Sequence, residues 1–335
     1  MTNDEMILGL VEKAIAVRAD LFDLPHEGAF RLFNGFREGF AGLSVDLFGK
    51  TLVLHNYAKP PENGEAVVKQ TLTYLLQRFD WIEAAIVKER WAVSAEKRNG
   101  TIHFGDKPTR AIREHGVRYA LDLCMNRDAS FYLDTANLRH WLLHNCRDQS
   151  VLNTFAYTGS LGVAAMAGGA SRVVQTDLNK RFLNVAKTSY TLNGFPIRKA
   201  DFITGDFWSV VKRLNRAKTR FDLVLLDPPF FSETRGGTVD LAKNVKQLIN
   251  KVRPLVQNEG RIVAINNALF FSGAQFMAAL QELTVGGWVE IEQIVDVSAD
   301  FTAYPSTRVQ PPITDPAPFN HATKIAILRI KHKTA

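Results

Sequence analysis

The chain has 335 residues, enough for two domains with substantial cores, and its 46% hydrophobic and 22% charged content is ordinary for a globular protein. It contains no apolar run of about 18 residues and begins with an acidic, polar stretch, which argues against a membrane span and a secretory signal. Its two cysteines, Cys124 and Cys146, exclude a disulfide framework and lack metal-ligand spacing. We therefore expect no metal and a cytoplasmic protein. Its formal charge of +7 favours a polyanionic partner.

The first 28 residues are predicted to form a helical lead-in. Apolar residues such as Met6, Val11 and Ile15 recur with partly helical spacing. This segment is interpreted either as a linker or RNA-facing arm, or as a helix packed on its neighbour. The second interpretation is favoured.

Residues 29–122 have a different character, with short β-prone runs between turn signals such as Asn34-Gly35. A helix is expected over 64–79. The pattern predicts a small α+β domain that binds substrate or RNA if Trp91 is exposed among its basic residues; burial of Trp91 in the core is the alternative. Those basic residues are Lys88, Arg90, Lys97, Arg98, Lys107, Arg110 and Arg113.

The third predicted domain, 123–335, alternates strands and helices from residue 151 onward, as a parallel sheet requires. We expect an α/β, Rossmann-like sheet of seven strands. Helices are expected over 179–192 and 238–253. The proline-rich stretch 304–320 is predicted to be a substrate-facing lid. The expected strands are 151–155, 172–177, 200–204, 222–226, 261–265, 288–296 and 323–330.

Acidic residues follow successive predicted strands at the spacing of a nucleotide site. The small-residue turn 155–159 opens a helix whose N-terminus suits a ligand carboxylate. Asp177 can then accept both ribose hydroxyls. Asp206 can accept from an adenine amino group, with Phe207 covering the ring. Each aspartate also suits a helix N-cap, and other nucleotides use similar turns, but the full order predicts S-adenosylmethionine.

The most specific motif is Asp227-Pro228-Pro229-Phe230, which follows four apolar residues. An aspartate and a proline carbonyl can both accept from a base amino group, and Phe230 can stack under the base. Methyl transfer from a sulfonium depends mainly on in-line positioning, which supplies about 7–11 kcal/mol. The motif therefore predicts transfer of a methyl group to nitrogen. A buried turn at a strand end is the alternative.

Together these motifs resemble the class I S-adenosylmethionine-dependent methyltransferases that modify large-subunit ribosomal RNA, of the I and K/L types. The resemblance covers roughly residues 30–330 and includes 130–134, 151–159, 167–170, 177–179 and 227–229. It implies the class I methyltransferase fold and a set of pocket residues. The implied cofactor-binding residues are Phe131, Asp134, Arg139, Phe155, Tyr157, Thr158, Gly159, Asp177, Leu178, Asp206 and Phe207, and the implied catalytic residues are Asp227, Pro228 and Phe230. For Asp134, a helix-capping role is the alternative.

Two departures from that family affect the expected substrate. Only 28 residues precede the central domain, too few for the family's PUA RNA-binding module. Cytosine-modifying relatives carry a cysteine after the fifth strand, because carbon-5 methylation normally needs a thiolate. Here Asn266-Asn267 stands there, as in the nitrogen-methylating branch, and is predicted to contact substrate together with Phe230; a loop that satisfies its own backbone is the alternative.

We therefore expect an N-methyltransferase for a base of large-subunit ribosomal RNA, acting as a monomer or homodimer. A carbon-5 cytosine methyltransferase, a small-molecule or protein methyltransferase, and an RNA-binding protein without turnover are the alternatives.

Overall fold

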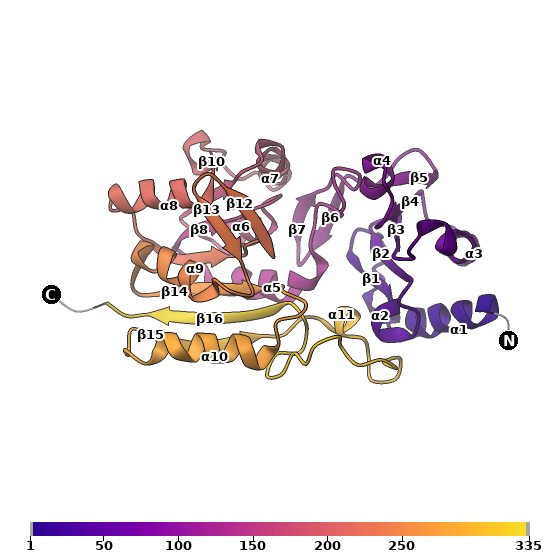
Figure 1. Ribbon diagram of the computed structural model, residues 1–335. Coiled ribbons are helices and arrows are strands. Elements are labelled where there is room, and N and C mark those ends of the chain that lie inside the picture. The colour runs from indigo at the N-terminus through magenta and orange to yellow at the C-terminus, as the bar shows by residue number, and fades with distance from the viewer. Residues whose placement is uncertain (1–2, 333–335) are drawn as a thin grey trace. The chain divides into compact units, whose positions relative to one another are not determined.

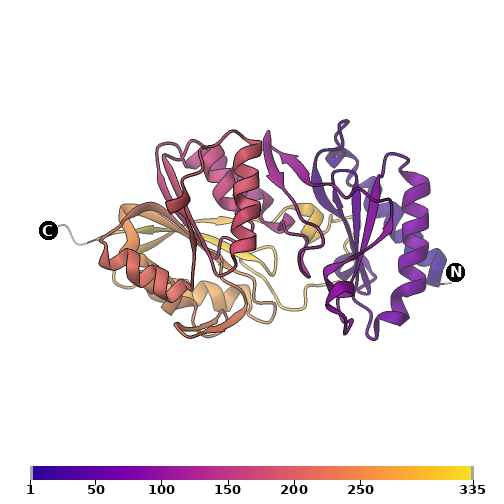
Figure 2. The same ribbon diagram turned by 90° about the horizontal axis from the view of Figure 1, so that it is seen from above.

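The computed structural model describes residues 3–332, which fall into two compact units (Figures 1 and 2). The N-terminal unit contains the chain up to Leu133 together with Ser298–Pro312. The C-terminal unit contains Asp134–Val297 and the chain from Ile313 onward. The two compact units divide after Leu133, whereas the predicted domain boundary is residue 122, and the described residues 3–28 pack within the N-terminal unit. No helix in the described range is long and apolar enough to cross a membrane.

The N-terminal unit is built on a five-stranded sheet in the order β1-β2-β3-β4-β5. Helix α1 places Ile7, Val11 and Ala14, all fully buried, in the core between this sheet and helix α3. The first segment is therefore a helix packed on its neighbour, as the favoured interpretation predicted. The elements are α1 Asn3–Ala16, β1 Ala29–Asn34, α2 Gly35–Glu38, β2 Leu43–Phe48, β3 Thr51–Asn56, α3 Glu65–Arg78, β4 Ala84–Glu89, α4 Ala95–Asn99, β5 Thr101–Phe104, β6 Ala111–Glu114 and β7 Val117–Ala120.

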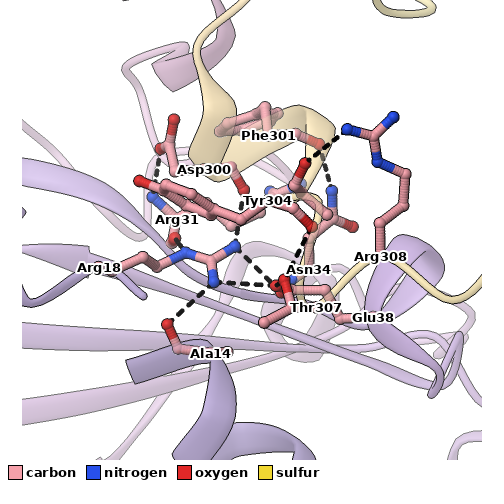
Figure 3. A network of polar contacts seen from close by, with 11 residues as sticks. Ala14, Arg18, Arg31, Asn34, Glu38, Asp300, Phe301, Tyr304, Thr307 and Arg308 are labelled. Carbon is pink, nitrogen blue, oxygen red and sulfur yellow. Dashed lines mark hydrogen bonds and ion pairs between the residues drawn. The ribbon is translucent and has the colours of Figure 1, made fainter. Parts of the chain in front are cut away.

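A distant segment, Ser298–Pro312 with helix α11 (Ala299–Thr302), completes this unit. The buried guanidinium of Arg18 donates to both Glu38 carboxylate oxygens at 2.9 and 3.0 Å and to the Asp300 carbonyl at 3.0 Å. The Thr307 hydroxyl donates to the same carboxylate at 2.5 Å (Figure 3). The lid prediction for 304–320 was therefore wrong for its first part, because this buried network anchors the segment.

The C-terminal unit is built on a seven-stranded sheet in the order β10-β9-β8-β11-β14-β16-β15, with β16 antiparallel to both neighbours. This confirms the predicted Rossmann-like fold, and the predicted strands agree with it closely. The strands are β8 Ser150–Thr154, β9 Arg172–Asp177, β10 Phe202–Thr204, β11 Phe221–Leu226, β14 Val256–Asn266, β15 Val289–Val295 and β16 Lys324–Ile330.

Helices cover both faces of this sheet, because its strands are apolar on both sides (Figure 2). Along β11, Leu223 and Leu225 pack with α5 and α6, whereas Val224 and Leu226 pack with α8, α9 and α10. The helices are α5 Ala136–Asn145, α6 Ser160–Ala167, α7 Lys180–Leu192, α8 Phe207–Arg216, α9 Val245–Val252 and α10 Gly273–Thr284.

The helix expected over 238–253 begins later, at Val245 in α9. A short hairpin of β12 (Phe231–Thr234) and β13 (Gly237–Asp240) precedes it. The hairpin turns at Arg235-Gly236, and Gly237, the first residue of β13, has φ +151°. The prediction extended the helix too far because Val239 and Leu241 continue its apolar spacing. Both side chains are buried, but both residues lie before the first residue of the helix.

Candidate active site

The predicted site residues of the C-terminal unit gather at one edge of its sheet. Strands β10, β9, β8, β11 and β14 are neighbours and parallel, so the loops after their carboxyl ends lie side by side. In open α/β sheets this edge is where ligands bind. It carries the turn 155–159, Asp177, Asp206 and the motif 227–230.

The turn after β8 has an unusual backbone. Phe155 and Tyr157 have φ of +52° and +51°, and Gly159 has φ +80°. Non-glycine residues in this region cost about 1–3 kcal/mol each and cluster at ligand sites. A Cβ on Gly159 would lie 2.5 Å from the Ala186 Cβ, so packing also requires glycine there. Thr158 is buried in the same turn, and α6 begins directly after it.

Asp177 ends β9 and holds this turn in place. Its carboxylate accepts from the Tyr157 and Asn179 backbone N–H groups, each at 2.8 Å. Burial raises the pKa of the carboxyl. Asn179, not Asp177, caps α7, so the capping alternative is not seen. Each oxygen keeps a second lone pair for a ligand hydroxyl. The next residue, Leu178, is exposed.

Asp206 follows β10 and is the N-cap of α8. One oxygen accepts from the Ser209 N–H at 2.9 Å and the other from the Thr234 hydroxyl at 2.6 Å. The capping alternative therefore holds here, and contact with adenine stays a prediction. Phe207 is buried, and its ring stacks on Phe155 with centroids 4.6 Å apart.

Asp227, directly after β11, is the exceptional carboxylate of this edge. It is half-buried, yet it accepts no hydrogen bond from any residue in the described range 3–332. Burial and the charge of Asp134 raise its pKa to about 7. Pro228 is buried beside it, whereas the Phe230 side chain is 51% exposed. The motif thus combines a desolvated hydrogen-bond acceptor, Asp227, with an exposed aromatic ring, Phe230.

Asp134, on the turn before α5, accepts from the Thr323 hydroxyl at 2.6 Å. Its predicted capping role is not seen, because Thr135 occupies the N-cap position of α5 without a side-chain cap. Arg139 is fully buried and donates to the Thr135 hydroxyl at 2.7 Å, which supports this turn. Phe131 belongs to the N-terminal unit, where its ring packs against Tyr119.

The two asparagines at the end of β14, Asn266 within the strand and Asn267 after it, differ. Asn266 is fully buried, and its amide donates to the Leu241 carbonyl at 3.2 Å and accepts from the Ala268 N–H at 3.0 Å. These bonds fit the loop-satisfying alternative, and contact of Asn266 with substrate stays a prediction. Asn267 is exposed. Because the Leu241 N–H donates to the Phe230 carbonyl at 3.0 Å, Asn266 ties the two neighbouring loops together.

Sequence reasoning missed Lys324 at the start of β16. This lysine is buried, its ammonium donates to the Ala268 carbonyl at 3.1 Å, and burial lowers its pKa to about 8. It therefore supports the loop that Asn266 also holds. A single cation directly before the apolar run 325–328 was the signal that could have revealed it.

Burial disfavours the thiolate form of both cysteines. Burial raises the pKa of Cys146 to about 12, and its side chain is fully buried. Cys124 belongs to the N-terminal unit, and burial raises its pKa too. Among the described residues, no group of three or more His, Cys, Asp or Glu side chains could hold a metal ion.

The donor and acceptor groups at the edge fit S-adenosylmethionine. The backbone of the left-handed turn at the start of α6 suits a carboxylate, Asp177 retains acceptor capacity for hydroxyls, and Asp227 is an unpartnered acceptor nearby. The model of the S-adenosylmethionine-dependent methyltransferase family matches residues 41–284, well over half of the chain. The chain belongs to this family. It is thus an S-adenosylmethionine-dependent methyltransferase.

Individual proteins agree with this assignment. YwbD of Bacillus subtilis, named provisionally as a ribosomal RNA large subunit methyltransferase, is 30% identical over 80% of this chain and 68% of its own length. Ribosomal RNA large subunit methyltransferase I of Alteromonas mediterranea is 28% identical over 71% of this chain and 60% of its own. The crystal structure of the methyltransferase SMU.776 with SAH matches the fold with a TM-score of 0.85 at 20% identity, covering 98% of this chain and 82% of that one.

Proposed function

We propose that this methyltransferase methylates a nitrogen of a base in large-subunit ribosomal RNA. The names of the relatives from Bacillus and Alteromonas support the RNA class. The chain spans 60–68% of these two relatives, so the substrate is inferred from the site as well as from the names. The observation that carries the proposal is the unpartnered, half-buried carboxylate of Asp227.

Asp227 suits a nitrogen target because such a nitrogen has a proton to give. The bound cofactor supplies an electrophilic methyl group on a sulfonium. As the N–C bond formed, the methyl carbon–sulfur bond would break and the cofactor would leave as a neutral thioether. The nitrogen would then have to lose its proton, which Asp227 could accept. A base with a pKa near the working pH is effective in this role, and the pKa of Asp227 is about 7. The half-exposed ring of Phe230 can stack under an unstacked base.

The cysteines argue for nitrogen rather than carbon 5 of a pyrimidine. Carbon-5 transfer normally needs a thiolate, and the chain has only Cys124 and Cys146. Burial keeps Cys146 protonated at neutral pH, and Asn266 occupies the strand end where cytosine-modifying relatives carry their cysteine. These positions support the nitrogen-methylating alternative.

Labelled-methyl transfer tests the proposal. The protein is incubated with tritiated S-adenosylmethionine and total RNA, protein extract or metabolites from a strain lacking the gene, and nucleosides are identified by mass spectrometry. We expect an N-methylated nucleoside in large-subunit RNA. A 5-methylcytidine product would refute the nitrogen target, and label confined to protein or metabolites would refute the RNA substrate.

A further inference from the structure

We propose that a pocket at the edge of the C-terminal sheet opposite the candidate active site binds a phosphate monoester through the guanidinium groups of Arg220 and Arg253. The pocket has a volume of about 380 Å³, and small-ligand sites usually have about 300–1,000 Å³. Such a site is separate from methyl transfer, and it does not require RNA to be the substrate.

The strand directions of the sheet bring the charged side chains of the pocket together. Arg220 directly precedes β11, and Arg253 opens the short 3-10 turn, Arg253–Leu255, that leads into β14. Because β11 and β14 are parallel neighbours, both arginines lie where these strands begin. Strand β16 is antiparallel to β14, so His332, two residues after the end of β16, lies at this edge too. The candidate active site lies at the other edge, where β11 and β14 end.

The wall of the pocket is formed by an irregular part of β14. The register between β11 and β14 shifts where residues 257–260 leave the regular ladder. Two of these residues, Gln257 and Asn258, line the pocket. The His332 backbone N–H donates to the Asn258 side-chain oxygen at 2.8 Å, and its ring Nε2 donates to the Val256 carbonyl at 2.9 Å. These bonds hold the wall in place without any ligand.

The pocket is positively charged, and no carboxylate within it balances that charge. None of the residues that line it, among those the structure describes, is Asp or Glu. The Arg220 guanidinium donates one hydrogen bond, to the Thr219 carbonyl at 3.1 Å. The half-buried Arg253 side chain has no hydrogen bond or ion pair with any residue in the range 3–332. A guanidinium has five N–H donors and is always charged, so most donors of both groups are available to an anion.

The segment before β11 adds to the positive potential. Residues 212–220 contain five Lys or Arg and no Asp or Glu. Two of them, Arg213 and Arg216, lie in the last turn of α8, where cations stabilise a helix through its dipole. That role does not explain Arg220 and Arg253, because both lie outside the helix. Their position in one pocket therefore favours a ligand with negative charge.

The class of ligand follows from charge and size. A phosphate monoester carries about −1.5 to −2 charge at pH 7, which matches two guanidinium groups, and each guanidinium can donate paired hydrogen bonds to it. The pocket has room for roughly a dozen water molecules at about 30 Å³ each, more than a phosphate group needs. Pro254 and Val256 also line it and provide an apolar surface for the organic part of the ligand.

The basic surface expected around Trp91 in the N-terminal unit is a weaker candidate for an anion. Trp91 is 52% exposed, so the exposed interpretation of this residue holds. However, Lys97 and Arg90 each pair with a carboxylate. Lys88, predicted to be part of this surface, is buried and donates to backbone carbonyls. The charges there are largely balanced.

Equilibrium dialysis with radiolabelled ribose 5-phosphate tests the pocket. We expect saturable binding by wild type with a Kd of about 1 mM or lower, and no binding of ribose, which lacks the phosphate. Arg220→Gln/Arg253→Gln should weaken binding by about 100-fold, because each arginine contributes about tenfold through charge-assisted hydrogen bonds. The control Arg213→Gln/Arg216→Gln removes the same charge from exposed positions on α8 and should keep the affinity within about twofold.

A short RNA distinguishes a free phosphate compound from the end of an RNA strand as the source of the phosphate. Fluorescence anisotropy compares a labelled single-stranded RNA that carries a 5′-phosphate with the same RNA carrying a 5′-hydroxyl. A preference for the phosphorylated end that disappears in Arg220→Gln/Arg253→Gln would support the site with an RNA end as its ligand. Equal binding of the two RNAs, together with binding of ribose 5-phosphate, would support the site with a free phosphate compound as its ligand.

The variants are first compared by thermal unfolding and by titration with S-adenosylmethionine, which should bind all of them with wild-type affinity because its expected site lies at the other edge of the sheet. Arg220→Lys/Arg253→Lys keeps both charges and should bind ribose 5-phosphate more tightly than the glutamine variant. The site would be overturned if wild type bound neither ribose 5-phosphate nor the RNA 5′-phosphate, if the glutamine variant kept the wild-type affinity, or if the α8 control lost as much.

Discussion

The pKa values of buried carboxylates are shifted in opposite directions in the two units. In the N-terminal unit, Asp46 accepts from Arg31 at 2.8 Å and lies 3.1 Å from His55. Burial alone would raise its pKa, but the Arg31 charge and the His55 bond outweigh burial and lower it. In the C-terminal unit, Asp227 has no such partner among residues 3–332, and burial with the charge of Asp134 raises its pKa to about 7.

This difference distinguishes carboxylates that stabilise the fold from a carboxylate that is available for chemistry. A buried charge with complete partners, such as Asp46 or Glu38, fixes the packing around it and has little capacity left for a ligand. A desolvated carboxylate without a partner costs stability, and such groups concentrate at functional sites. The comparison therefore points to Asp227 as the group most directly involved in transfer.

The largest expected effect is on catalysis. Asp227→Asn should lower kcat by about 10²–10⁴-fold, the usual contribution of a proton acceptor, while cofactor affinity stays measurable. Single-turnover methyl transfer and titration calorimetry provide the two readings. Asp148→Asn is the matched control, because Asp148 is exposed and its φ of +62° suits asparagine. Wild-type turnover in Asp227→Asn would remove this residue from the chemistry.

The next effect is on stability, in the network that holds Ser298–Pro312 to the N-terminal unit (Figure 3). Glu38→Gln leaves the buried guanidinium of Arg18 uncompensated and should cost about 3–5 kcal/mol of unfolding free energy. Urea unfolding gives the value. Lys50→Met removes the exposed pair with Glu83 and should cost less than about 1 kcal/mol. Equal losses in both variants would contradict the importance of burial.

A third carboxylate lies between the two extremes, because Asp177 is held by backbone N–H groups yet keeps acceptor capacity. Asp177→Asn should weaken S-adenosylmethionine binding by about 10–100-fold, since an acceptor of charge-assisted hydrogen bonds becomes a neutral amide. Calorimetry measures the affinity, and circular dichroism checks the fold. Unchanged affinity would show that the cofactor does not use this strand end.

The two pKa shifts predict opposite dependences of stability on pH. The raised pKa of Asp227 means that its contribution is complete below about pH 4, the unfolded value, and is lost as pH rises through about 7. The lowered pKa of Asp46 means that its contribution is present above about pH 4 and lost at lower pH. The urea midpoint of unfolding should therefore depend less on pH between about 4 and 7 in Asp227→Asn, and less on pH below about 4 in Asp46→Asn. Identical profiles would refute the contrast.

The smallest effect is expected from the cysteines. Cys124→Ser and Cys146→Ala should leave methyl transfer within about twofold of wild type, because burial raises the pKa of both thiols and so favours their unreactive, protonated form. The same transfer assay applies. An inactive variant with a normal unfolding curve would show that a thiol takes part after all, and carbon-5 transfer would then be the better proposal.

The sequence by itself determined the catalytic fold and the strand ends that carry its site. Short apolar runs such as 223–226 that alternate with helical segments favour strands buried on both faces, and the residues that end parallel strands lie at the same edge of the sheet. The order of Asp177, Asp206 and Asp227 along the chain thus placed them together without coordinates. Short-range patterns were sufficient because each strand, turn and helix start is a local feature.

Only the tertiary structure decided which of these side chains already has a partner. Asn266 ends an apolar strand and Asp227 directly follows another. The Asn266 amide is bonded to backbone groups of Leu241 and Ala268, whereas the Asp227 carboxylate accepts no hydrogen bond from the described part of the chain. The placement of Ser298–Pro312 in the N-terminal unit likewise depends on Arg18 and Glu38, hundreds of positions earlier. Burial and partnership are set by long-range contacts, which no local pattern encodes.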